Sequence, residues 1–280
     1  MSFALTLLTT TVMGPYWTHP DLAEKLPLLT PRAVVEVLGS PELLAHGLSF
    51  ALPVLFILGC HEWGHWWACR RHGLVARPPV FLPAPLAIGT FGAFIRILQP
   101  VRNRRQLLEV GASGPWAGLV AVLPLLLWRA VSPPGPGAAT GDIELAEPLA
   151  LRLTRLAFGG DIWETPILSP DPLLFALWIG LLVTAFNLLP LGQLDGGHVL
   201  YALLGSRQHR IGQLLWLALL IGGWWWPGWW VWALITLLTG LKHPPTRDPS
   251  RPLGKSAALF ASATLLLWVL VGSVVPLRAL

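Results

Sequence analysis

Charged side chains are scarce in this chain of 280 residues: Asp, Glu, Lys and Arg make up 12% of it, whereas 54% is hydrophobic. In soluble domains about a quarter of the residues are charged. A surface so poor in charge excludes an ordinary water-soluble protein. The sequence therefore predicts an integral membrane protein whose surroundings are the lipid bilayer.

Cysteine is equally rare, and only Cys60 and Cys69 occur. On one helix they would lie about 13 Å apart along its axis, which is too far for a disulfide. The first 13 residues lack the basic start and the small-residue cleavage site of a secretory signal. We therefore expect neither a disulfide nor a cleaved signal peptide.

Acidic residues are missing from one long segment. Residues 70–105 hold seven arginines and no acid, whereas residues 132–171 hold six acids and two arginines. Basic loops of membrane proteins face the cytoplasm. The net charge of +5 is thus better explained by membrane topology than by nucleic-acid binding, and we expect no nucleic-acid partner.

Long apolar stretches are present, and a membrane-crossing helix needs about 20 residues. Residues 2–13 are short for a span and form either an interfacial segment or a tilted helix. Residues 14–42 indicate a polar connection, and the Pro- and Gly-rich residues 132–171 a loop. We predict an all-α polytopic protein with about six transmembrane helices, at 43–69, 106–131, 172–204, 211–223, 229–241 and 256–276.

The strongest motif is HEWGH at residues 61–65. On a helix, His61 and His65 share one face and can both reach one metal ion, while Glu62 is placed to act as a general base. Ionisable groups inside an apolar helix are costly, which favours a functional site over a pair of core histidines. The motif therefore predicts a zinc site.

A catalytic zinc usually has three protein ligands, so a third is needed. Asp195 in QLDGG is the best candidate, because the break at 187–197 exposes polar groups near the same predicted depth as His61. A helix-capping role for Asp195 is the alternative. His198 remains a second candidate ligand or a residue that supports one. Four other residues are weaker candidates: His46 and His72 are distant along the helix, Cys60 points away from the histidine face, and Cys69 lies beyond His65 next to Arg70.

Residues 78–98 contain several prolines and then GTFGAFIRI (89–97), which argues against a helix. The pattern indicates a short re-entrant β-hairpin. Such a strand can hold an extended peptide by strand addition, which makes Gly92 and Phe94 candidate substrate-binding residues.

With HEWGH, GASGPWAG (111–118) and NLLPLGQLDGGHVL (187–200), the chain resembles the site-2 protease family of intramembrane zinc metallopeptidases. GTFGAFIRI and LKHPPTRDP (241–249) resemble elements of one bacterial and plastid branch, while the polar loops are too short for the PDZ or CBS domains of many members. The resemblance implies regulated intramembrane proteolysis, with a transmembrane protein substrate already trimmed outside the membrane.

The resemblance also assigns roles. It implies one Zn²⁺ held by His61, His65 and Asp195, Glu62 as general base, and Asn187 as a catalytic group that stabilises the oxyanion. A helix-break role is the alternative for Asn187. We expect one peptidase domain over 1–280, comprising an N-terminal segment 1–42, a catalytic core 43–204 and C-terminal helices 205–280. The expected location is the cell's inner or plasma membrane, with the active site toward the cytoplasm.

Two other classes of function remain open. A membrane zinc-binding protein without protease activity would keep the histidines and not depend on Glu62. A metal transporter often shows paired internal repeats with interrupted helices, and no such repeat is evident in the sequence.

Overall fold

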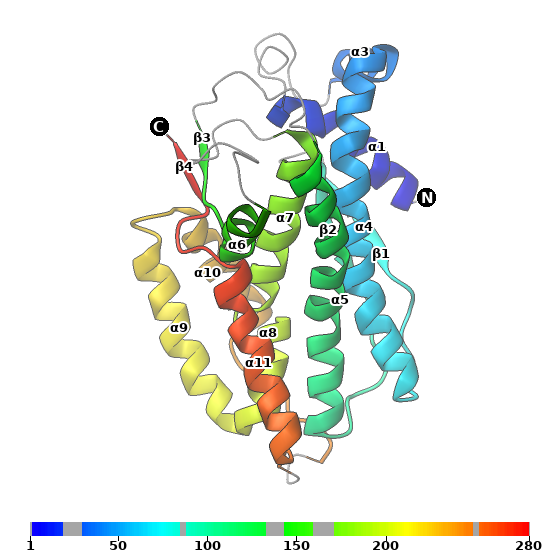
Figure 1. The fold of residues 1–280 in the computed structure, drawn as a ribbon. Helices are drawn as coiled ribbons and strands as arrows, with labels where there is room; N and C mark the ends of the chain where they lie inside the picture. The colour runs from blue at the N-terminus through cyan, green and yellow to red at the C-terminus, as the bar shows by residue number, and fades with distance from the viewer. Residues whose placement is uncertain are drawn as a thin grey trace.

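The computed structural model describes residues 2–18, 30–84, 88–132, 143–158, 171–248 and 252–279. Pro85 of the predicted hairpin and most of the predicted loop 132–171 lie outside the described residues. Within the described part the chain is mostly helical, and its long helices run side by side (Figure 1).

Among the described helices, two are long and apolar enough to cross a membrane, α4 (Pro41–Arg71) and α5 (Arg104–Val131). Both carry start signals: the Ser40 side chain accepts from the Leu43 N–H, and the Asn103 side chain accepts from the Gln106 N–H. Such caps satisfy backbone donors that have no partner within the helix. Each helix extends two residues or fewer beyond the range that the sequence predicts.

The centre of the bundle is α7 (Pro172–Asn187), which is buried on nearly every side. A helix that is apolar all round belongs inside a packed structure. Its core neighbours include Phe50 and Val54 of α4, and Val122 and Leu126 of α5. After α7 the chain turns through residues 188–194 and continues as α8 (Asp195–Leu204), as the predicted break requires.

The C-terminal part follows a short 3₁₀ turn, η1 (Gly205–Arg207). It contains α9 (Gln208–Gly222), α10 (Gly228–Thr239) and α11 (Lys255–Val271), close to the three ranges expected. Of these, α10 and α11, together with α7, are apolar helices shorter than a full span.

The predicted hairpin segment contains β1 (Val80–Pro83) and β2 (Thr90–Phe94), which pair antiparallel with Val80 opposite Phe94. A second small sheet, β3 (Ile143–Leu145) with β4 (Leu277–Ala279), was not predicted. Its strands are three residues long and more than 130 residues apart, so no local pattern marks them. The all-α class is therefore corrected to mostly helical with two small sheets.

The described residues contain three further helices where the sequence indicated connections or a short apolar segment. The first, α1 (Ser2–Thr18), extends beyond the apolar residues 2–13, and α3 (Pro31–Gly39) follows a Thr30 cap. In the predicted loop, α6 (Leu149–Phe158) buries only Leu151. Two of them, α3 and α6, are only nine and ten residues long, and the Pro- and Gly-rich sequence around them is typical of connections.

Candidate metal centre

The two histidines of HEWGH lie one turn apart on α4, and both are buried. The Nε2 atoms of His61 and His65 are 3.2 Å apart. Asp195, the first residue of α8, places one carboxylate oxygen 3.1 Å from His61 Nε2 and the other 3.2 Å from His65 Nε2. The turn after α7 thus brings together three residues that are far apart in sequence.

This donor set fits a zinc ion. Ligand atoms held about 2.1 Å from a tetrahedral zinc are separated by about 3.4 Å, close to the spacings found here. His65 Nδ1 lies 2.7 Å from the Val110 carbonyl oxygen and must donate to it, which leaves the Nε2 lone pair facing the cluster. The carboxylate oxygens and imidazole nitrogens converge at distances that suit a divalent cation between them. Among the described residues, these three form the one such group of His, Cys, Asp and Glu.

Three glycines of GASGPWAG, which lie on α5, leave space for the side chains of the cluster and for His198. A Cβ at Gly114 would lie 2.1 Å from His65 Nε2, and one at Gly118 would lie 3.3 Å from His61 Nδ1. A Cβ at Gly111 would lie 2.7 Å from the Cβ of His198. Small residues at these positions let the imidazoles of His61 and His65 and the side chain of His198 lie against α5.

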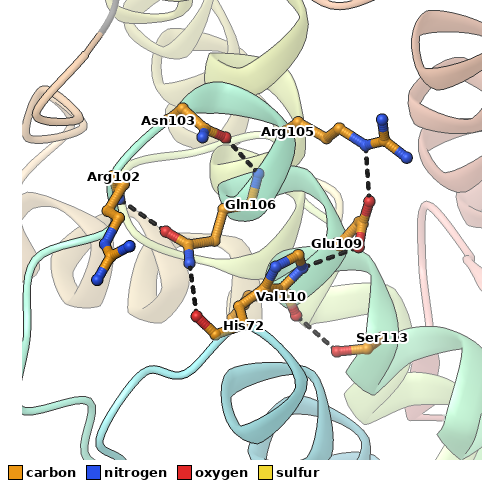
Figure 2. A network of polar contacts seen from close by, with 8 residues as sticks. All are labelled: His72, Arg102, Asn103, Arg105, Gln106, Glu109, Val110 and Ser113. Atoms are coloured by element: carbon orange, nitrogen blue, oxygen red, sulfur yellow. Dashed lines mark hydrogen bonds and ion pairs between the residues drawn. The ribbon is translucent and has the colours of Figure 1, made fainter.

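The support of His65 continues into a polar network at the start of α5 (Figure 2). Val110 also accepts from the Ser113 hydroxyl at 2.8 Å. Beside it, Glu109 lies 2.8 Å from His72 Nε2, and Arg105 donates to the same carboxylate at 3.0 Å. These contacts tie the last turn of α4 to the first turns of α5, the two helices that hold His65 and its carbonyl partner.

The break before Asp195 is shaped by glycine. Gly192 has a φ of +51°, and a Cβ there would lie 2.2 Å from the Gly240 carbonyl oxygen. A Cβ at Gly196 would lie 2.0 Å from the Leu188 carbonyl oxygen. The chain therefore folds tightly back on α8, and this sets where the Asp195 carboxylate projects.

A cavity of about 400 Å³ opens beside the cluster. Its polar lining includes His61, Glu62 and Asn187, and the backbone N–H of Ile95 contacts the Glu62 carboxylate. The remaining walls are apolar or come from β2; they include Thr90, Phe91, Gly92, Ala93, Phe175, Trp178, Ile179, Leu182, Val183, Phe186 and Trp232. The cavity thus reaches the cluster at His61, beside Glu62.

The predicted site residues are thus mostly gathered at one place. Gly92 lines the cavity, whereas Phe94, at the end of β2, is 44% exposed and is not among the lining residues. The residues of α7 that line the cavity were not identified from the sequence. Ile179 and Val183 precede Asn187 at helical spacing, so all three lie on one face of α7, and this spacing could have identified them.

Residues 49–221 match the sequence model of peptidase family M50. This range contains Glu62 and all three predicted ligands. The chain is 37% identical over 197 residues to the probable zinc metalloprotease EGY2, chloroplastic, of Oryza sativa subsp. indica, an alignment that covers 69% of this chain and 36% of that protein.

Two Arabidopsis thaliana proteins are similar as well. EGY2 is 36% identical over 169 residues, covering 59% of this chain and 30% of that protein. EGY1 is 31% identical over 175 residues, covering 59% and 32%. Both are described as probable zinc metalloproteases of the chloroplast. The alignments thus span about a third of each relative's length.

Proposed function

Because this chain belongs to peptidase family M50, we propose that it is a zinc metalloprotease that hydrolyses peptide bonds of membrane-spanning proteins within or near the bilayer. The observation that carries the proposal is the convergence of His61, His65 and Asp195 on one point, with Glu62 in the wall of the adjoining cavity. A zinc ion alone would explain the ligands, and Glu62 is the residue that makes the site catalytic.

A zinc ion held by these three residues supplies Lewis-acid activation of water and of the scissile carbonyl. Glu62 accepts a proton from the attacking water and later returns it to the leaving amine. Asn187, in the opposite wall, donates an amide N–H to the carbonyl oxygen as negative charge develops there. Each of these roles requires that the scissile bond lie in the cavity between α4 and α7.

The substrate segment must be extended, because a helical peptide bond is shielded by its own hydrogen bonds. Among the described strands, β2 pairs only with β1. Residues Thr90 to Ala93 line the cavity, so an extended segment can add to β2 there. Gly92 and Phe94 remain our candidate substrate-binding residues. A single-span regulatory protein, first trimmed outside the membrane, is the substrate class that we propose.

The membrane arrangement is also a proposal. The helices α4 and α5, the broken pair α7 and α8, and then α9, α10 and α11 give about six crossings. The arginine-rich connection between α4 and α5 favours a cytoplasmic position for that end. His65, His72 and the start of α5 lie toward it. We therefore place the active site toward the cytoplasmic side of the cell membrane.

Glu62→Gln tests the activity. We expect the purified variant to keep about one zinc per chain and to cleave a transmembrane test peptide about 10²- to 10⁴-fold more slowly, because the amide cannot accept the proton. Glu42→Gln, in the first turn of the same helix, is the matched control and should cleave as wild type does. Equal cleavage by wild type and Glu62→Gln would rule out Glu62 as the base.

A further inference from the structure

The loop after α10, residues 240–248, carries a His-Pro-Pro sequence that the catalytic proposal does not use. Backbone N–H groups of Arg247 and Asp248 donate to carbonyls of residues 101 and 102, just before α5. At its other end the loop packs on the broken helix, because the Gly240 carbonyl oxygen lies against Gly192. The loop therefore spans from the break that precedes Asp195 to the start of α5.

Gln208, at the start of α9, holds the middle of this loop. Its side-chain amide donates to the Leu241 carbonyl at 3.2 Å, and its carbonyl accepts from the His243 backbone N–H at 3.2 Å. Gln208 is 1% exposed and His243 is 5% exposed. The imidazole of His243 is thus fixed in a buried, well-defined place.

The hydrogen bonds of His243 decide its tautomer. Its Nδ1 lies 2.5 Å from the Pro244 carbonyl oxygen, an atom that can only accept, so Nδ1 carries the proton. Burial lowers the pKa of His243, an effect partly offset by the Pro244 carbonyl, so the ring is neutral near pH 7. The Nε2 atom is therefore an acceptor.

The partner of that acceptor is His198. His198 Nδ1 lies 2.6 Å from His243 Nε2 and must be the donor. His198 belongs to α8, one turn after Asp195, and its Cβ packs against Gly111 of α5, next to the Val110 carbonyl that holds His65. The His198 imidazole thus lies between α8, which carries Asp195, and α5, whose Val110 carbonyl contacts His65.

We propose that His243 is a positioning residue for the metal centre. By accepting the Nδ1–H of His198, it fixes the tautomer and orientation of that imidazole, and so the position of α8, which carries Asp195, against α5. The proposal rests on the proposed metal site. In this role the His-Pro-Pro loop holds α8 in position through the hydrogen bond between His243 and His198. The proposal also makes His198 a supporting residue, with Asp195 as the ligand.

The ring of His243 has a second contact, which the test must separate from the hydrogen bond. Tyr201 stacks on it, with ring centroids 4.5 Å apart. His243→Gln keeps an acceptor near the position of Nε2 and removes the ring. His243→Phe keeps the ring and its stacking and removes the acceptor. His209→Phe is the control, since the nearby His209 Nδ1 is buried with no hydrogen-bond partner among the described residues.

The experiment uses the full chain in detergent. Zinc affinity is measured by competition with a chromophoric chelator, and the visible absorption spectrum is recorded after loading the protein with Co²⁺. We expect His243→Phe to bind zinc about 10- to 100-fold more weakly and to show an altered Co²⁺ spectrum. His243→Gln should stay within about threefold of wild type, as should His209→Phe. Cleavage of the test peptide is recorded alongside.

Unchanged zinc affinity and Co²⁺ spectrum in His243→Phe would overturn the proposal, and so would equal losses in the Phe and Gln variants, which would assign the effect to ring packing. If His243→Phe is not monodisperse, His198→Asn and His198→Leu replace the pair, since only Asn keeps a donor near Nδ1. Failure of the wild type and of His209→Phe to bind zinc would instead refute the metal site itself.

Discussion

Glycine and alanine differ by one methyl group, and at Gly114 that difference decides whether a ligand fits. The His65 ring occupies the space in which the Cβ would stand, 2.1 Å from Nε2. Since Gly114 lies inside a rigid helix, neither α5 nor the ring can move aside without shifting the metal centre. The residue has no side chain and no charge, yet the geometry of the cluster of His61, His65 and Asp195 depends on it.

Gly114→Ala is therefore expected to lose most of its zinc although every ligand remains, and to cleave the test peptide about 10- to 100-fold more slowly, as for loss of a supporting group. Zinc per chain, measured by elemental analysis, is the readout. Gly39→Ala is the control, because a Cβ at Gly39 meets nothing within 4 Å. Normal zinc content in Gly114→Ala would mean that the ring can be displaced without cost.

At the scale of elements, the site depends on how closely α4 and α5 approach. A Cβ at Gly64 would lie 2.5 Å from the Ser113 carbonyl oxygen, whereas a Cβ at Gly59, on the same helix, would meet only the Phe81 ring at 3.5 Å. The first position is at the helix–helix contact and the second is not. Small residues at such contacts let transmembrane helices pack backbone to backbone.

Gly64→Ala should therefore destabilise the protein, by about 1–3 kcal/mol, because the added methyl forces α4 and α5 apart. Gly59→Ala gains the same helix propensity without that clash and should be neutral or slightly stabilising. Thermal unfolding of both variants in detergent, followed by intrinsic tryptophan fluorescence, compares them directly. A melting temperature for Gly64→Ala at or above that of Gly59→Ala would contradict the packing argument.

At the scale of the whole molecule, the ligands connect separate parts of the chain. His61 and His65 come from α4, Asp195 comes from α8, and α5 lies against both helices. The unfolded chain does not hold these residues together, so metal binding favours the folded state. The metal centre thus acts as a cross-link through the middle of the bundle.

Removing the metal with a chelator should lower the melting temperature of the wild type. At a free zinc concentration about 1,000-fold above the dissociation constant, the bound ion contributes about 4 kcal/mol, or roughly 10 °C for a chain of this size. Asp195→Ala should melt at the same temperature with and without chelator. An equal response of the two proteins would show that the ion which stabilises the fold is bound elsewhere.

The sequence by itself predicted the mostly helical architecture and the three residues that meet at the candidate metal centre. Long apolar runs with little charge are a local signal of long helices, so the ends of α4 and α5 were predicted to within two residues. The spacing of HEWGH places two histidines on one helical face because the helical period is local. Such features depend on neighbours along the chain and are readable without a fold.

Tertiary structure decided what depends on distant partners. The antiparallel pair β3 and β4 has too few residues to leave a pattern, and Leu145 pairs with Leu277, which is distant in the sequence. The contact between His198 and His243 joins residues 45 positions apart, and no spacing rule predicts it. The sequence left Asp195 and His198 as alternative ligands. The fold placed the Asp195 carboxylate beside both Nε2 atoms and His198 beside His243, because the turn at Gly192 sets the direction of α8.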